Sequence, residues 1–224
     1  MPATGATSID GPVSFAEVLK VPRETIHRLE RYAELLGHWQ KTVNLVAPST
    51  LASLWSRHFA DSAQLLNLAP DARLWLDLGS GAGFPGLVIA ILGSGTPGFH
   101  MHLAEVNAKK CAFLGEVARA TNAPVEIHPV RIEDFAASAD TIRPHIVSAR
   151  ALAPLPRLLG LAAPFFGAET RVLFLKGREA EEEVGAARAE WEADFHLHPS
   201  LTSRDGKIVE VTGLTPLSAL DVRP

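Results

Sequence analysis

The sequence predicts an α/β protein: a doubly wound, mostly parallel seven-stranded sheet with an N-terminal helical extension. Two observations lead to this prediction. Apolar runs of strand length alternate with helical segments from residue 74 onward, and the first run is followed by a glycine-rich turn. Alternation of this kind favours parallel strands, because each parallel connection needs a crossover that is usually a helix.

The length and composition suit one large α/β domain with an appendage. The chain has 224 residues and a mass of 24.0 kDa, and 47% of its residues are hydrophobic. We expect a disordered lead-in over residues 1–14, an N-terminal helical lid over residues 15–70, and the main domain over residues 71–224. The single cysteine, Cys111, excludes an intrachain disulfide.

The first elements are predicted to be helices. Apolar residues at positions 26, 29, 32, 33, 36 and 39 repeat with a period of 3.6, which indicates an amphipathic helix over 24–40. A second helical stretch is expected over residues 51–66. Pro70 and Asp71 then close this region.

The remaining segments build the sheet. Strands are expected over residues 74–78, 99–106, 125–130, 145–149, 171–176, 193–197 and 207–212. Helices are expected over residues 86–92, 108–120 and 154–166, with a short turn after Ile132. No helical pattern separates the last two strands, so residues 199–206 predict an antiparallel hairpin at one edge of the sheet.

The turn after the first strand predicts a nucleotide-cofactor site, since glycines let a ligand approach the backbone at a helix N-terminus. Two patterns overlap there. Gly81, Gly83 and Gly86 satisfy the dinucleotide pattern G-x-G-x-x-G. Asp77, Gly79, Gly81 and Gly83 also satisfy D-x-G-x-G-x-G, which is typical of S-adenosylmethionine-dependent methyltransferases.

Charge favours the methyl donor over a dinucleotide. A carboxylate close to the loop, Asp77, would repel a pyrophosphate and tolerate a sulfonium and an ammonium. Glu105, after the second strand, is placed to accept hydrogen bonds from ribose hydroxyls in either case, so it does not discriminate.

Metal and membrane sites are not expected. His100 and His102, like His196 and His198, alternate along strands, and the sequence locates no third ligand for either pair, so we interpret them as sheet-face residues. No apolar segment has the length to span a bilayer, and the N-terminus lacks the positive segment of a secretory signal. We therefore expect a cytoplasmic protein.

Four ordered motifs make the chain resemble one family, the bacterial 16S ribosomal RNA guanine-N7 methyltransferases, also called glucose-inhibited division protein B. They are Trp39 to Leu45 (W-x-K-x-x-N-L), Arg57 to Ser62 (R-H-x-x-D-S), Asp77 to Gly86 (D-x-G-[ST]-G-x-G-[FL]-P-G) and Ser148 to Ala151 (S-R-A with an inserted alanine). The likeness spans about residues 25–215. The residues that follow Glu105 depart from the pattern, which often has serine after the acid.

The resemblance implies a class I, Rossmann-like methyltransferase that uses S-adenosylmethionine. It implies cofactor contacts from Gly79, Gly81, Phe84, Glu105, Ile132, Glu133 and Arg150, and substrate-binding candidates at Asn44, His58, Asp61 and Lys176. No catalytic residue is assigned, because guanine N7 carries a lone pair and no proton, so its methylation needs no general base.

The partner implied is 16S ribosomal RNA, and an assembled or partly assembled small subunit would compensate for the acidic net charge of −4. Three other functions remain open at this point. They are methylation of a protein or small molecule, an NAD(P)-dependent oxidoreductase that uses the dinucleotide pattern, and a binding module that only retains the fold.

Overall fold

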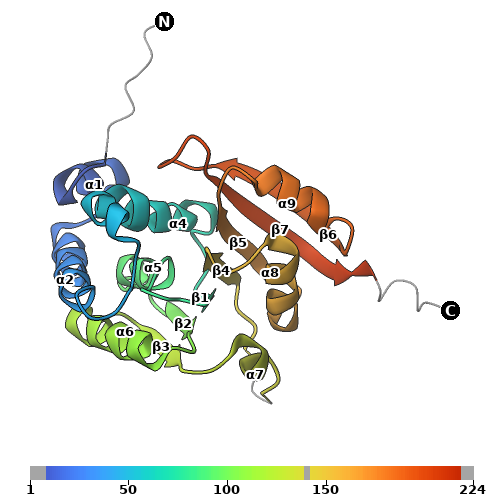
Figure 1. Ribbon diagram of the computed structural model, residues 1–224, viewed down its shortest axis with the longest axis horizontal. Helices are drawn as coiled ribbons and strands as arrows, with labels where there is room; N and C mark the ends of the chain where they lie inside the picture. The colour runs from blue at the N-terminus through green and yellow to red at the C-terminus, as the bar shows by residue number, and fades with distance from the viewer. Residues whose placement is uncertain (1–8, 139–141, 218–224) are drawn as a thin grey trace, which may run out of the picture.

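The computed structural model describes residues 9–138 and 142–217, and these form one seven-stranded sheet between two layers of helices (Figure 1). The strands are β1 (Leu74–Leu78), β2 (His100–Ala104), β3 (Val125–His128), β4 (Ile146–Arg150), β5 (Arg171–Lys176), β6 (Trp191–Pro199) and β7 (Lys207–Pro216). Their order is β3-β2-β1-β4-β5-β7-β6. The predicted fold class is confirmed.

The first five strands are parallel, and β7 runs antiparallel to both of its neighbours. The predicted hairpin at the sheet edge is therefore present. Its strands are longer than the sequence pattern indicated, because β6 and β7 stay paired from Trp191 and Pro216 to the turn.

The helices before the sheet are α1 (Pro12–Leu19), α2 (Arg23–Trp39), the 3₁₀ helix η1 (Pro48–Ser53), the π-helical turn η2 (Trp55–Ala60), α3 (Asp61–Ala63) and α4 (Leu65–Leu68). Those within the sheet region are α5 (Gly86–Gly93), α6 (Ala108–Thr121), α7 (Ile132–Ala136), α8 (Leu155–Ala162), the 3₁₀ helix η3 (Ala163–Phe165) and α9 (Ala180–Ala187). No helix in the described part of the chain is long and apolar enough to cross a membrane.

The N-terminal helices differ from the prediction in two places. The lead-in was expected to reach residue 14, but α1 begins at Pro12, where proline suits the first helical turn; residues 1–8 lie outside the described part. The single helix expected over residues 51–66 is instead broken into η1, η2, α3 and α4. Within η2, the Arg57 carbonyl accepts a hydrogen bond from Arg150 of β4.

Two hydrophobic clusters hold the layers together. On one face, Leu29 and Leu36 of α2 pack in the same buried cluster as Val88 of α5 and Met101 of β2. On the other face, α8 and α9 cover β1, β4 and β5. The N-terminal helices thus share the core of the sheet, and residue 70 does not divide it.

Candidate functional site

The loop between β1 and α5 is built for close approach of backbone. Gly79, Gly81 and Gly83 have φ angles of +65°, +58° and +89°, a left-handed region that side chains rarely adopt. A Cβ atom on Gly79 would lie 2.7 Å from a methyl group of Leu152. Gly79 and Gly81 remain partly accessible, whereas the loop from Ala82 to Gly86 is buried.

Asp77 supports this loop from below. Its side chain is fully buried, and its two oxygens accept hydrogen bonds from the Ser148 hydroxyl at 2.9 Å and from the Gly86 N–H at 3.2 Å. Burial raises the pKa of Asp77 from 3.8 to about 7 against these hydrogen bonds. The carboxyl group therefore joins β4 to the N-terminus of α5. The comparison of charges in the sequence assumed that this carboxylate faces the accessible part of the loop, and the structure shows that it does not.

Glu105 closes the same loop from β2. One carboxylate oxygen accepts from the Gly81 N–H at 2.8 Å, and the other accepts from the Asn107 N–H at 2.8 Å. The neighbouring Val106 is 60% exposed, and Leu152, which lies over Gly79, is 37% exposed. Two large apolar side chains thus lie open beside the glycine backbone and the acid.

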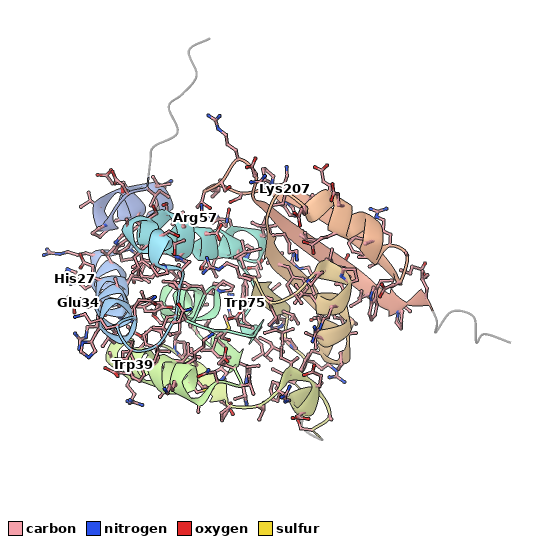
Figure 2. The ribbon with its side chains drawn as sticks, in the orientation of Figure 1. His27, Glu34, Trp39, Arg57, Trp75 and Lys207 are labelled. Atoms are coloured by element: carbon pink, nitrogen blue, oxygen red, sulfur yellow. The ribbon has the colours of Figure 1, made fainter. Side chains whose placement is uncertain are left out.

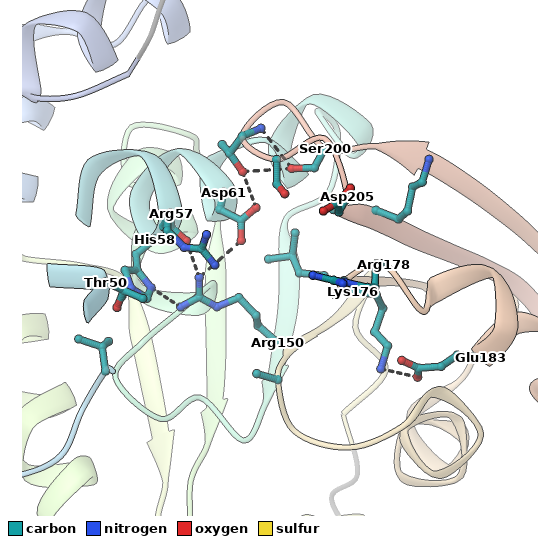
Figure 3. Close-up of a pocket in the computed structure, with 18 of the residues that line it drawn as sticks. Thr50, Arg57, His58, Asp61, Arg150, Lys176, Arg178, Glu183, Ser200 and Asp205 are labelled. Atoms are coloured by element: carbon teal, nitrogen blue, oxygen red, sulfur yellow. Dashed lines mark hydrogen bonds and ion pairs between the residues drawn. The ribbon is translucent and has the colours of Figure 1, made fainter. Parts of the chain in front are cut away.

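Arg150, at the end of β4, binds the N-terminal helices to the sheet (Figure 3). Its guanidinium donates to the Arg57 carbonyl at 2.9 Å and to His58 Nδ1 at 2.6 Å, and it forms an ion pair with Asp61 at 3.5 Å. It also lies 5.0 Å from the centre of the buried Phe84 ring, which is a cation–π contact.

This contact accounts for the π-helical turn η2 within the helix predicted over residues 51–66. In an α-helix the Arg57 carbonyl would accept from the N–H of Asp61. In η2 that N–H bonds instead to Ser56 and His58, which leaves the Arg57 carbonyl free to accept from Arg150. A π-helical turn at a functional site commonly re-aims groups in this way.

His58 is held as a neutral imidazole of defined tautomer. Because a guanidinium can only donate, Nδ1 of His58 is an acceptor, and Nε2 carries the proton and donates to the Thr50 hydroxyl at 2.8 Å. Burial and the positive charges of Arg150 and Arg57 lower the pKa of His58 to about 3. Both ring nitrogens are therefore engaged.

Lys176 is also engaged. Its ammonium lies 2.6 Å from a carboxylate oxygen of Glu183 in α9 and donates to the Ala153 carbonyl at 3.0 Å. Glu183 lies in the first turn of α9 and also lines this site.

These groups line a cavity of about 640 Å³ between the N-terminal helices, the ends of β4 and β5, and the β6–β7 turn. Ser200, Thr202, Ser203 and Asp205 of the turn form one wall, and the Thr202 hydroxyl donates to Asp61 at 2.8 Å. Figure 3 shows Arg150 and Lys176 facing this space from neighbouring strands.

The cavity carries excess positive charge. Asp61 is paired with Arg150, and Glu183 with Lys176. Arg57, Arg178, Lys207 and the carboxylate of Asp205 form no ion pair with any residue in the described ranges, so the unpaired charges of the lining are three cations and one anion. Arg57 and Lys207 lie at the same edge of the molecule (Figure 2). Arg178 and Lys207 were not predicted as site residues, because only the end of β5 and the β6–β7 hairpin bring them to the same cavity as Arg57.

Eight of the eleven predicted site residues fall into two groups, and Asn44, Ile132 and Glu133 belong to neither. His58, Asp61, Arg150 and Lys176 line the cavity, while Gly79, Gly81, Phe84 and Glu105 belong to the glycine loop or contact it. Asn44 is exposed and does not line the cavity, although its neighbours Leu45 and Val46 do. Ile132 packs partly against the second hydrophobic cluster, and Glu133 beside it is exposed.

The Trp39 segment serves packing. The Trp39 indole donates to Glu116 of α6 at 2.9 Å, and the Gln40 side chain bonds to the backbone of Leu45 and Val46.

Away from the cavity, β3 places Glu126 and His128 beside His100 and His102. The third ligand that the sequence did not locate for this histidine pair therefore lies next to it.

The sheet order and the glycine loop are those of the class I methyltransferase fold. One solved structure with this fold is a putative O-methyltransferase from Klebsiella pneumoniae (TM-score 0.58, 13% identity, covering 92% of this chain and 97% of that one). Another is a mutant of MtNAS in complex with S-adenosylmethionine (TM-score 0.52, 14% identity, covering 92% and 86%).

Closer relatives define the family. The model of the GidB family, rRNA small subunit methyltransferase G, matches residues 25–209. Ribosomal RNA small subunit methyltransferase G of Parvibaculum lavamentivorans is 51% identical over 94% of this chain and 93% of its own length. The protein of the same name from Methylorubrum populi is 50% identical, covering 87% and 92%. The chain belongs to the GidB family of methyltransferases, so the resemblance found in the sequence is confirmed.

Proposed function

We propose that this protein transfers the methyl group of S-adenosylmethionine to N7 of a guanine in 16S ribosomal RNA, in the cytoplasm. The observation that carries the proposal is the cavity beside the glycine loop, with three cations from separate elements around it that have no ion-pair partner among the described residues. Family membership favours a methyltransferase over the oxidoreductase and over a binding module without activity.

The residues around the glycine loop fit the methyl donor. The partly accessible backbone of Gly79 and Gly81 would lie along its methionine end, and the Glu105 carboxylate would accept from its ribose hydroxyls. Ile132 and Glu133 would lie at the adenine, together with the exposed side chain of Val106, whereas Leu152 lies over Gly79. When bound, this cofactor supplies an activated methyl group on a sulfonium sulfur.

For Arg150 and Phe84, which were predicted to contact the cofactor, we propose a different role. Phe84 is 4% exposed, and its ring stacks on Tyr32 and His58. We assign both residues to positioning: they fix the N-terminal wall of the cavity relative to the glycine loop.

The charges at the cavity rim favour an RNA substrate. Arg57, Arg178 and Lys207 are free to pair with phosphates, which position a nucleic acid without reading its sequence. Lys176, His58 and Asp61 are held by their own partners and shape the wall, and Asn44 lies outside it. The hydroxyl group of Ser203, which lines the cavity, would meet a base edge.

The chemistry of the cavity suits an N7 acceptor. The one imidazole among the described residues that line it, His58, has both nitrogens hydrogen-bonded and a pKa of about 3. His58 therefore offers no free ring nitrogen to remove a proton, and N7 of guanine has none to lose. Rate would come from near-attack positioning of the two reactants.

The test is transfer of a labelled methyl group from S-adenosylmethionine to small-subunit RNA that lacks the modification. We expect label in one guanine base, mapped by mass spectrometry, and calorimetric binding of S-adenosylmethionine without binding of NAD. Assembled subunits should be methylated faster than naked RNA, because ribosomal protein surface adds contacts that an acidic enzyme needs. Label in a protein or small molecule instead of RNA would contradict the proposal.

A further inference from the structure

The edge of the sheet opposite the hairpin gathers three imidazoles and a carboxylate on one face. In the parallel register His102 of β2 lies beside Glu126 of β3, and His128 lies beside Ala104 (Figure 1 shows β2 next to β3). Side chains two residues apart on a strand share a face, so His100 joins His102, and His128 joins Glu126. Neither the family motifs nor the proposed reaction uses these residues.

The ligand atoms of this cluster converge. Nδ1 of His102 lies 2.8 Å from Nε2 of His128. Oxygens of the Glu126 carboxylate lie 3.8 Å from Nε2 of His100, 3.7 Å from Nδ1 of His102 and 3.9 Å from Nε2 of His128. One ligand atom from each of His100, His102 and Glu126 lies within 4.8 Å of the others.

We propose that His100, His102, His128 and Glu126 form a site for a single divalent transition ion of the zinc class. Three imidazole nitrogens and one carboxylate oxygen make a four-ligand set that suits zinc, whereas magnesium and calcium prefer sites of oxygen only. A tetrahedral ion with Zn–N bonds of about 2.0–2.1 Å needs nitrogens about 3.3 Å apart. Closing the site asks His102 and His128 to separate by a few tenths of an ångström, and it asks the Glu126 carboxylate to move closer to the three imidazoles.

The protons balance without a further reactant. One of the two imidazoles donates the hydrogen bond between His102 and His128, and that ring must present its lone pair to the ion instead. Its proton moves to the other ring nitrogen by exchange with water, so the neutral rings need not release a proton to bind the metal.

The surroundings hold the ligands in place and leave an entry path. The side chains of His102 and His128 are 10% and 16% exposed, and those of His100 and Glu126 are 41% and 58% exposed. The His128 ring stacks on Phe135 of α7 at 4.3 Å between centres.

The second alternating histidine pair is a matched control. His196 and His198 on β6 also face a glutamate, Glu210, with His198 Nε2 2.7 Å from its carboxylate. There, however, the Arg171 guanidinium lies 2.7 Å from the same carboxylate. Its positive charge opposes a cation, so this pair should bind no metal.

The experiment is a titration of the tag-free, chelator-treated full chain with Zn²⁺, followed by calorimetry and by thermal unfolding. We expect one ion per chain, a rise in the melting temperature with Zn²⁺ but not Mg²⁺, and visible absorption bands typical of four-coordinate Co²⁺. Removing a residue that only hydrogen-bonds to a metal ligand weakens metal affinity roughly 10–100-fold. Removing a ligand itself should therefore weaken the affinity at least about tenfold. This loss is expected for His102→Gln, for His128→Gln and for Glu126→Gln.

Glu126→Gln changes an exposed side chain, so it tests the site even if the histidine variants fail to fold. The His196→Gln/His198→Gln double variant should bind Zn²⁺ as the unmodified chain does. Absence of stoichiometric binding, unchanged affinity in Glu126→Gln, or an equal loss in the β6 variant would each overturn the proposal. These readouts do not depend on methyl transfer, so they stand apart from the function proposed above.

Discussion

Arg150 shows how one side chain couples two parts of the chain that lie far apart in sequence. A guanidinium offers five N–H donors in a fixed plane, and here they reach a carbonyl, an imidazole and a carboxylate of the N-terminal helices. An ammonium group has neither the reach nor the planar fork for all three acceptors.

Arg150→Lys should therefore destabilise the protein by about 1–3 kcal/mol, because buried acceptors lose their donors while the charge is kept. Urea unfolding measures this loss. Arg143→Lys is the control, since Arg143 is an exposed arginine that donates to the Ile142 and Pro164 carbonyls. Equal losses in the two variants would show that the Arg150 network has no special weight.

Asp77 should make stability depend on pH. Its pKa is about 7 in the folded chain against an ordinary value of 3.8, so the folded state retains a proton that the unfolded chain releases. Folding is thus favoured below pH 4, and this advantage is lost as pH rises through 7, by an amount on the order of a few kcal/mol.

Asp77→Asn removes the titrating group, so the stability of the unmodified chain relative to this variant should fall between about pH 4 and pH 7. Urea unfolding at several pH values gives the free energy of unfolding of both proteins. Taking the difference between them cancels the contributions of the other titrating groups, which the two proteins share. Asp71→Asn, at an exposed position, should show no such trend. A flat difference for Asp77→Asn would contradict burial as the cause of the shift.

At the scale of elements, α5 lies so close to β1 and β2 that its first residue must lack a side chain. A Cβ atom on Gly86 would lie 2.4 Å from Leu103 and 2.8 Å from Asp77 Oδ2. Gly185 in α9 has open space around the same position.

Gly86→Ala should destabilise the protein by about 1–3 kcal/mol through overpacking. Gly185→Ala should stabilise it by up to about 1 kcal/mol, because alanine is the better helix former and meets no obstacle. Chemical denaturation of both variants checks the opposite signs. If both changes had the same sign, the close packing of α5 would not be the controlling factor.

At the scale of the whole molecule, an acidic protein acquires a basic rim by folding. The net charge is −4, yet Arg57, Arg178 and Lys207 meet around one cavity without ion-pair partners in the described part of the chain. Local charge, and not the sum, decides whether a phosphate backbone is attracted.

Arg178→Gln and Lys207→Gln should each weaken RNA binding and reduce the slope of log affinity against log salt by about 0.7–0.9, the value for one phosphate contact. Fluorescence anisotropy with small-subunit RNA at several salt concentrations gives this slope. Arg119→Gln on α6, an exposed arginine that does not line the cavity, should leave it unchanged. If the slope were the same in all three variants, Arg178 and Lys207 would not belong to the RNA-binding surface.

The sequence by itself determined the sheet, its hairpin edge and the glycine loop. These depend on local patterns: period-2 and period-3.6 apolar spacing, and glycines where the backbone needs a left-handed φ. The ordered motifs also identified the family, because several motifs at fixed spacing rarely coincide by accident.

Only the tertiary structure decided which polar groups meet. Arg150 breaks the helix at Arg57, Glu183 binds Lys176, and Glu126 and His128 lie beside His100 and His102. Each of these contacts joins two elements that are brought together by the strand order and register of the sheet. The separation of such residues along the chain follows no repeating pattern, so a single sequence does not reveal the contact. Contact chemistry is non-local, whereas secondary structure is largely set by near neighbours in the chain.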